Sequence, residues 1–325
     1  MSLPEPPAFV LADRPLRRFA TVRTGGAAEW FARVGDEDEL LAALRWARVA
    51  AQPVAVLGSG SNLLIADEGV RGLVLKLDRT LARIERDGAD LICGGGARLP
   101  AVAAEAARAG LSGIEFGVNI PGTVGGAVRM NANAYGGRLA DTLVSVRIAT
   151  GEGIGERAPG VLGFGYRSSA LRDGEIVARA RLRLQQAEPA VVRATLGEMR
   201  TRRHEAQPQG IKTFGSTFKN PDDAAVAAAT SGRAGGRAKR RAAGTATAGT
   251  LLSEAGCNGL RIGGARFAPK HANFVENLGE ASTAEIVALM AEGRRRVQER
   301  FGIELEPEVQ TLGPVRFPWA GANGT

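Results

Sequence analysis

The densest glycine cluster of the chain reads GIEFGVNIPGTVGGAVRMNANAYGG, from Gly113 to Gly137. It holds seven glycines in 25 residues, interleaved with threonine and asparagine side chains that can form hydrogen bonds. A structural turn needs only one or two glycines, where the backbone is left-handed or lies very close to another group. The stretch therefore predicts a loop whose backbone lines a ligand site. A plain glycine-rich connection between strands is the simpler alternative.

A second, shorter cluster follows a predicted strand and reads VAVLGSGSN, from Val54 to Asn62. Successive backbone N–H groups at the end of such a strand form a concave nest that binds anions such as a pyrophosphate. The pattern is not a dinucleotide-binding fingerprint of the Rossmann type, because the third glycine is missing and no helix clearly follows. Alone, it predicts a phosphate loop about as well as an ordinary strand-to-turn connection.

Together with motifs elsewhere, the two clusters closely resemble the UDP-N-acetylenolpyruvoylglucosamine reductases, which have a vanillyl-alcohol-oxidase-like FAD fold. The motifs occur in the family's order: IPGTVGGA (120–127), MNANAYGG (130–137), GYRSS (165–169), GSTFKNP (215–221), GLRIGGA (259–265), KHANF (270–274) and LEPEV (305–309). The resemblance runs from about residue 15 to residue 312. The short spacing between Arg167 and Ser216 resembles the family's compact type II members, which lack a substrate-capping insertion.

The expected fold class is α+β, with two domains. The resemblance implies a PCMH-type FAD-binding domain over residues 1–187 and a smaller α/β substrate-binding domain over residues 188–325. The boundary is placed where the sequence changes from alternating strand residues to a basic helical pattern. Residues 223–249 are rich in alanine, glycine, threonine and arginine and predict a low-complexity surface insertion.

Capping signals predict two amphipathic helices. Asp36 and Glu39 form one capping-box-like pair, and Ser282 and Glu285 form another, whose helix is expected to end at Gly302. After the insertion, order is expected to return at Leu251, and residues 303–312 alternate apolar and acidic types, which predicts a final strand. On that strand Glu304, Glu306 and Glu308 would share one face.

The resemblance implies which residues bind the cofactor, FAD. They are Gly58, Ser59, Gly60, Ser61, Asn62, Leu63, Gly117, Pro121, Gly122, Thr123, Gly125, Gly126, Ala127 and Asn131. Neither loop contains a histidine or cysteine that could attach the flavin, so we expect FAD to be bound non-covalently. Asn119 and Asn133 depart from the family, which more often has glycine there, and could reshape the second loop.

The resemblance also implies three catalytic residues, Arg167, Ser216 and Glu308. The reaction has two halves: hydride passes from NADPH to bound FAD and then to the enolpyruvyl double bond, after which a proton reaches the neighbouring carbon. Arg167 is expected to bind the substrate carboxylate through its planar fork of donors. Ser216 would give the proton, and Glu308, in its protonated form, would stabilise the enolate-like intermediate together with the arginine.

Three further residues are expected to bind the substrate, a UDP-sugar enolpyruvyl ether of peptidoglycan precursor synthesis. They are Lys219 and Asn220, for the diphosphate, and Lys270, for charge near the substrate. Beside them, His271 is expected to be structural. A different FAD oxidase of the same fold, acting on a sugar or an alcohol, is the alternative enzyme, and a non-catalytic flavin-binding scaffold is the alternative outside enzymes.

Composition restricts the partners. The formal net charge is +8, but five of the basic residues lie in 224–250, and aromatic residues make up only 5% of the chain, so we expect no nucleic-acid partner. Only two histidines and two widely separated cysteines are present, so we expect neither a metal site nor a disulfide. No apolar run approaches the roughly 20 residues of a membrane span, and we expect a cytoplasmic monomer.

Overall fold

A computed structural model describes residues 4–222 and 246–319 of the chain. These residues form two compact units that are not continuous in sequence. Unit 1 consists of residues 1–14, 28–60 and 71–205, and unit 2 of residues 15–27, 61–70 and 206–325. The sequence analysis predicted two domains that are each continuous in sequence, with a boundary between residues 187 and 188. That boundary stays a prediction.

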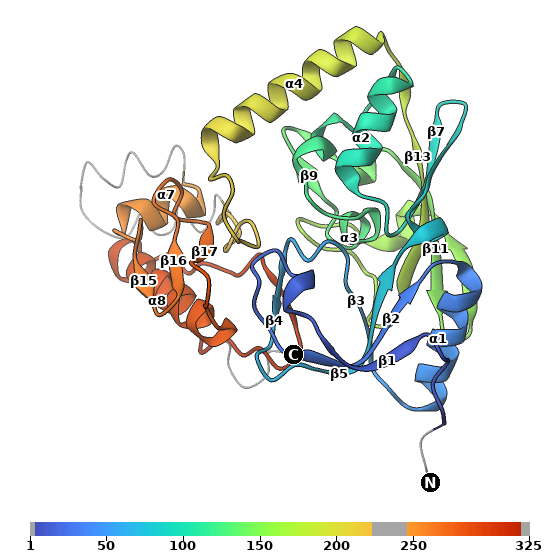
Figure 1. Cartoon of the computed structure of the whole chain (residues 1–325). Coiled ribbons are helices and arrows are strands. Elements are labelled where there is room, and N and C mark those ends of the chain that lie inside the picture. Colours follow the sequence, from blue (N-terminus) through green and yellow to red (C-terminus); the bar gives the residue numbers. More distant parts are fainter. Residues whose placement is uncertain (1–3, 223–245, 320–325) are drawn as a thin grey trace. The chain divides into compact units, whose positions relative to one another are not determined.

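Two sheets build unit 1 (Figure 1). The first has the strand order β1-β2-β5-β3. Its strands are β1 (Val10–Pro15), β2 (Ala27–Val34), β5 (Val70–Leu77) and β3 (Val54–Val56). Strands β3 and β5 run parallel, and Leu57 extends their pairing by donating its N–H to Leu75 O at 2.8 Å. The first glycine loop therefore begins where this pairing ends.

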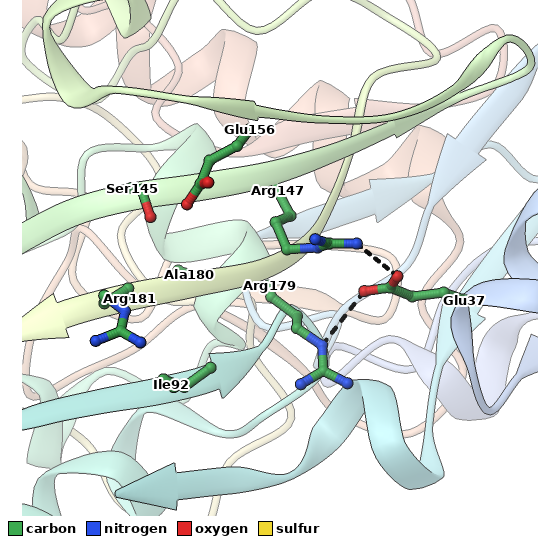
Figure 2. Close-up of a pocket in the computed structure, with 8 residues that line it drawn as sticks. All are labelled: Glu37, Ile92, Ser145, Arg147, Glu156, Arg179, Ala180 and Arg181. Atoms are coloured by element: carbon green, nitrogen blue, oxygen red, sulfur yellow. Dashed lines mark hydrogen bonds and ion pairs between the residues drawn. The ribbon is translucent and has the colours of Figure 1, made fainter. Parts of the chain in front are cut away.

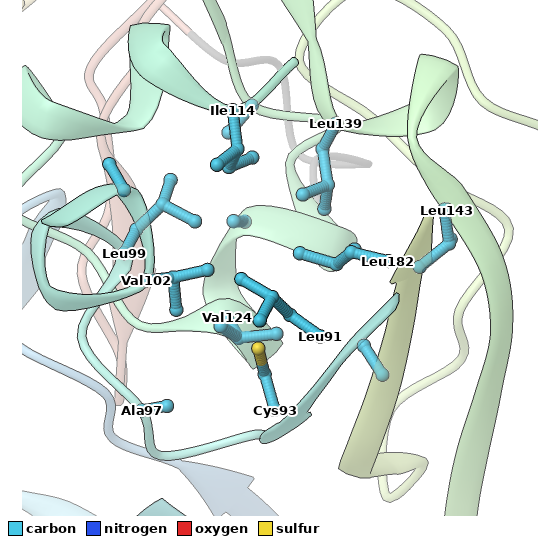
Figure 3. Packing of buried hydrophobic residues seen from close by; sticks show 14 of the residues in the cluster. Leu91, Cys93, Ala97, Leu99, Val102, Ile114, Val124, Leu139, Leu143 and Leu182 are labelled. Atoms are coloured by element: carbon cyan, nitrogen blue, oxygen red, sulfur yellow. The ribbon is translucent and has the colours of Figure 1, made fainter. Parts of the chain in front are cut away.

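The second sheet is antiparallel and has the order β12-β11-β13-β7-β6. Its strands are β12 (Gly153–Arg157), β11 (Leu143–Thr150), β13 (Ile176–Arg183), β7 (Asp90–Gly94) and β6 (Ile84–Asp87). One face packs on helices α2 (Leu99–Arg108) and α3 (Val124–Arg129), and Figure 3 shows the side chains of Leu91, Cys93 and Leu182 in this core. The cluster of buried residues fixes the second glycine loop, because that loop leads into α3.

Helix α1 (Glu37–Val49) belongs to a second core, which it shares with β2 and β5 and with the ends of β11 and β13. The predicted cap is present: the Asp36 side chain accepts a hydrogen bond from Glu39 N at 2.9 Å. The carboxylate of Glu39 turns to Gly35 N at 2.7 Å, one residue before the partner that a capping box would use.

The remaining elements of unit 1 are short, apart from one helix. Helix α4 (Pro189–Ala206) has 18 residues. Two short pairs join β8 (Leu111–Ser112) to β14 (Gln185–Gln186) and β9 (Asn133–Ala134) to β10 (Gly137–Arg138). Four 3₁₀ turns cover Arg79–Ala82, Glu115–Asn119, Leu139–Asp141 and Pro159–Leu162.

Within its described residues, unit 2 contains two helices and two small sheets (Figure 1). An antiparallel sheet has the order β15 (Arg261–Ile262), β16 (Ala265–Phe267), β17 (Val275–Asn277). Helix α8 (Thr283–Phe301) contacts β16 and α7 (Ala248–Glu254). A parallel pair joins β4 (Leu63–Ile65) to β18 (Gln310–Leu312), and a 3₁₀ turn covers Arg17–Phe19. The capping box of Ser282 and Glu285 and the left-handed Gly302 at the end of α8 are confirmed.

Two sequence predictions in unit 2 are wrong. The final strand spans only Gln310–Leu312, and the segment before it makes a single bridge, from Pro307 to Phe218. Helix α7 already begins at Ala248, after the Thr247 side chain that caps it at Thr250 N, so the predicted start at Leu251 is too late. The rest of the predicted insertion, residues 223–245, lies outside the described residues.

Candidate functional site

The first glycine loop lies directly against Thr123 of the second. A Cβ added to Gly58 would come within 2.6 Å of Thr123 Oγ1, so no other residue fits without movement. Gly60 has a φ of +62°, which is the left-handed region that glycine adopts without strain. The backbone from Gly58 to Gly60 is therefore held in a conformation that side chains would disturb.

Backbone hydrogen bonds to residues 95–97, the segment before α2, hold the second loop in place. Val124 N donates to Ala97 O and Gly125 N donates to Gly95 O, both at 2.8 Å. Thr123 is the N-cap of α3 and accepts from Gly126 N at 3.4 Å. A Cβ on Gly122 would meet nothing closer than 3.8 Å, so this glycine leaves open space beside the loop. Two backbone-lined loops thus meet at Thr123.

Asn131 gives a direct test of whether FAD fits these loops. Its side chain donates to Gly165 O at 3.1 Å, while its Oδ1 is buried and has no partner in the described part of the chain. An unpaired buried acceptor is costly, and a ligand that donates a hydrogen bond would satisfy it. Asn131 therefore offers an acceptor that suits such a ligand, and the assignment of the loop residues to FAD stays a prediction.

Arg167 lies on a strained turn next to Asn133. Its Nη1 donates to Asn133 O at 3.2 Å, and its guanidinium lies 5.6 Å from the ring centre of Tyr166. Arg167 has a φ of +54°, and Asn131 and Tyr135 also have positive φ, at +40° and +51°. Non-glycine residues in this region cost free energy and gather at functional sites. The cluster marks Arg167 as a constrained, half-buried cation.

The two asparagines that depart from the family both hold backbone. Asn119 is buried, donates from Nδ2 to Met199 O of α4 at 2.7 Å, and accepts at its carbonyl from Arg203. Asn133 Nδ2 contacts Asn131 O at 3.4 Å, and its carbonyl is the acceptor of Arg167. A glycine at position 119 could not make the side-chain contact to α4.

Unit 2 brings Ser216 and Glu308 onto neighbouring segments. Glu308 N donates to Thr217 O and Lys219 N donates to Glu306 O, both at 2.9 Å. Ser216 and Glu308 are half-buried, whereas Glu304 and Glu306 are exposed. The three glutamates do not share a strand face as predicted, because the segment is not a strand.

Part of the first glycine loop joins this segment within unit 2. Asn62 Nδ2 donates to Glu308 O at 3.3 Å, and Asn62 O accepts from Gln310 N at 3.1 Å. A Cβ on Gly215 would be 3.6 Å from Ser61 O. Residues Ser61–Leu63, predicted to bind the cofactor, therefore lie beside both Ser216 and Glu308. Arg167, the third predicted catalytic residue, belongs to unit 1, and its approach to the other two stays a prediction.

Asn273, which sequence reasoning did not single out, fixes the segment that carries Ser216. Its side chain is buried, accepts from Phe218 N and donates to Phe218 O, both at 2.9 Å. Its carbonyl also accepts from Thr217 N at 2.8 Å. The Asn273 side chain thus makes the hydrogen bonds to Phe218 that a neighbouring strand would otherwise make. The only sign of this role in the sequence was the position of Asn273 within the KHANF motif.

The predicted substrate-binding residues have partners within the protein. Lys219 Nζ pairs with Glu306 at 3.2 Å, and Asn220 Oδ1 accepts from Ala248 N at 3.1 Å. Lys270 is exposed on the turn before His271. His271 packs edge-to-face on Phe274 with ring centres 5.0 Å apart, and burial lowers its pKa. These contacts fit the structural role expected of His271.

A surface hollow on the open face of the antiparallel sheet contains none of the predicted site residues. Figure 2 shows Arg147 and Arg179 reaching Glu37 of α1, at 2.7 and 3.3 Å. On the same sheet, Arg181 and Arg183 pair with Asp90. The arginines are compensated by carboxylates, so the charge here ties the sheet to α1 and leaves no cation for an anionic ligand.

Other chemistry finds little support in the described residues. They contain no group of three or more His, Cys, Asp or Glu residues that could hold a metal, and no helix long and apolar enough to cross a membrane. Cys93 and Cys257 are free and buried, and burial raises their pKa to about 12 and about 11. A buried thiol with a raised pKa is mostly protonated and therefore unreactive.

Comparison with known proteins matches both parts of the chain. Residues 28–157 match an FAD binding domain, and residues 207–312 match the UDP-N-acetylenolpyruvoylglucosamine reductase C-terminal domain. UDP-N-acetylenolpyruvoylglucosamine reductase 2 of Symbiobacterium thermophilum is 40% identical, over 96% of this chain and 94% of that protein. The Rhizorhabdus wittichii reductase is 41% identical, over 96% and 95%. The crystal structure of the Thermus caldophilus reductase has a TM-score of 0.74 at 35% identity, covering 93% of this chain and 98% of that one.

Proposed function

Because the chain belongs to the UDP-N-acetylenolpyruvoylglucosamine reductase family, we propose that Arg167, Ser216 and Glu308 carry its reaction. The protein is an FAD-binding oxidoreductase of peptidoglycan precursor synthesis, of a family that uses FAD and NADPH. Its proposed substrate is the enolpyruvyl ether of UDP-N-acetylglucosamine, and its proposed product is UDP-N-acetylmuramate. Bound FAD supplies hydride transfer from NADPH to the substrate double bond.

Arg167 is proposed to bind the substrate carboxylate. A guanidinium is permanently charged and offers a planar fork that matches a carboxylate. The contacts to Asn133 O and the Tyr166 ring restrict its motion before substrate arrives. A fixed cation stabilises negative charge that develops in the transition state without reorganising at that moment.

Ser216 and Glu308 are proposed to complete the reaction after hydride transfer. Their shared backbone ladder through Thr217 is the observation that carries the assignment, because it fixes a hydroxyl and a carboxyl group on adjacent segments. Ser216 would give a proton to the substrate carbon, and Glu308 would stabilise the enolate-like charge beside it. Glu308 must be protonated for that role.

The loops are proposed to hold FAD non-covalently through the fourteen residues assigned above, with Lys219, Asn220 and Lys270 on the substrate. The ion pair of Lys219 with Glu306 would then open or be shared when the diphosphate binds. A cytoplasmic location, a monomeric state and the absence of nucleic-acid and membrane partners belong to the same proposal.

Anaerobic spectroscopy tests the proposed function. The purified protein should be yellow, NADPH should bleach the flavin absorbance, and the enolpyruvyl sugar nucleotide should restore it without oxygen. A sugar or alcohol oxidase of this fold would instead be bleached by its own substrate and recoloured by oxygen. A protein that stays colourless with added FAD, or that NADPH does not bleach, would contradict the proposal.

A further inference from the structure

Lys76 of β5 is a half-buried cation that the catalytic assignment leaves unused. Its Nζ donates a hydrogen bond to Gly58 O at 2.7 Å. Among the described residues no carboxylate lies within ion-pair distance of it. Burying a charged amine without such a partner costs free energy. A negatively charged group bound near the first glycine loop would offset that cost for Lys76.

The hydrogen bond to Lys76 sets the direction of one peptide unit of the loop. Since a trans peptide is planar, with its C=O and N–H pointing in opposite directions, the N–H of Ser59 points away from Lys76. That N–H has no acceptor in the part of the chain that the structure describes. Ser59 directly follows Gly58, the residue that lies against Thr123 of the second loop.

The charge around Lys76 is positive. Residues 58–63 and 117–127 contain no basic or acidic side chain, so the loops themselves offer only backbone and neutral groups. Burial and the nearby charges of Arg33 and Arg98 lower the pKa of Lys76. Asp78 acts in the other direction, but it is paired with Arg33 at 3.6 Å. An anion at the loops would relieve this excess of positive charge.

We propose that Lys76 is a positioning residue for the diphosphate of FAD, holding the Gly58–Ser59 peptide with its N–H toward the anion and placing positive charge behind the loop. The inference rests on the assignment of these loops to FAD. It does not depend on which residues transfer the proton. Riboflavin, which has the same ring system but no phosphate, should gain nothing from Lys76.

The test compares FAD and riboflavin binding to apoprotein of Lys76→Met, Lys76→Arg and Arg71→Met. Arg71 is exposed on the same strand, so its variant removes a charge without touching the loop. Lys76→Met should weaken FAD binding about 10- to 100-fold, as expected for a hydrogen bond from a charged group, and leave riboflavin binding within about twofold. Lys76→Arg should recover most of the loss, and Arg71→Met should match wild type.

Salt and melting temperature separate a binding role from a folding role. FAD affinity of wild type should fall with added salt more steeply than that of Lys76→Met, while the two apoproteins melt alike. Unchanged FAD affinity in Lys76→Met, or an equal loss of FAD and riboflavin, would overturn the inference. Wild-type protein that binds neither ligand would instead overturn the assignment of the loops.

Discussion

The glycine loops of unit 1 and the Ser216–Lys219 segment of unit 2 prepare their functional groups in different ways. At the loops, the absence of a side chain sets the conformation: Gly58 has none where Thr123 lies, and the groups proposed to bind a ligand there are backbone N–H groups. In the segment, the proposed functional groups are side chains, and hydrogen bonds with Asn273, Glu306 and Glu308 fix the backbone that carries them.

The difference predicts how each region fails. Bulk or lost charge at the loops should weaken cofactor binding and leave the chemistry of bound flavin intact. Changes in the segment should leave the protein yellow but impair the substrate half of the reaction. Measuring flavin content, bleaching by NADPH and recolouring by substrate separately therefore distinguishes the two regions.

Among the variants in unit 2, Ser216→Ala should cause the largest loss of activity. Loss of a positioned proton donor should slow recolouring by substrate about 10²- to 10⁴-fold, while bleaching by NADPH and flavin content stay normal. Stopped-flow absorbance in the absence of oxygen measures both halves. Ser253→Ala, at an exposed position of α7, is the control. Equal slowing of both halves would count against the role of Ser216.

Arg167→Ala should lower turnover about 10²- to 10³-fold, the usual loss for one donor aimed at developing charge. Flavin content should not change, although Arg167 donates to Asn133 O of the second loop. Arg167→Lys keeps both the positive charge and the strained backbone but not the fork, so it should recover only part of the rate. Near-normal turnover in Arg167→Ala would show that the arginine is structural; the exposed Arg172→Ala serves as the control.

Asn273→Ala should slow recolouring by substrate about tenfold or more, because the segment that carries Ser216 loses both side-chain braces. Asn277→Ala is a matched control. Its buried amide also holds backbone, at Val22, Gly279 and Ala281. Both variants should lose similar thermal stability, since each leaves buried backbone groups unpaired. If the two also slowed recolouring equally, Asn273 would have no positioning role.

Asp90→Asn should have the smallest effect on activity, because Asp90 belongs neither to the glycine loops nor to the Ser216–Lys219 segment. Hydrogen bonds from Arg183 and Arg181 lower the pKa of Asp90 to about 2. A lowered folded-state pKa stabilises the protein above the unfolded value of about 3.9. The variant should therefore melt roughly a few degrees lower at pH 7. The difference from wild type should shrink as the pH falls from about 4 toward 2, and a difference that does not change with pH would contradict this.

The sequence by itself determined the family, the cofactor and most of the elements near the loops. Glycines at positions 58, 60 and 122 are informative because few backbone geometries require them, and the capping residues Asp36 and Ser282 act on the turn that follows them directly. Such signals are local, so a single sequence carries them.

Only the tertiary structure decided which residues far apart in the sequence come into contact. The alternation over residues 303–309 has the period of a strand, yet the residues make one bridge, because strand formation depends on a partner segment and this one is paired only where Pro307 faces Phe218. The bracing of Phe218 by Asn273 and the contact of Lys76 with Gly58 join residues 55 and 18 positions apart. Nothing in the local pattern encodes such pairs, because they arise when separate elements pack together.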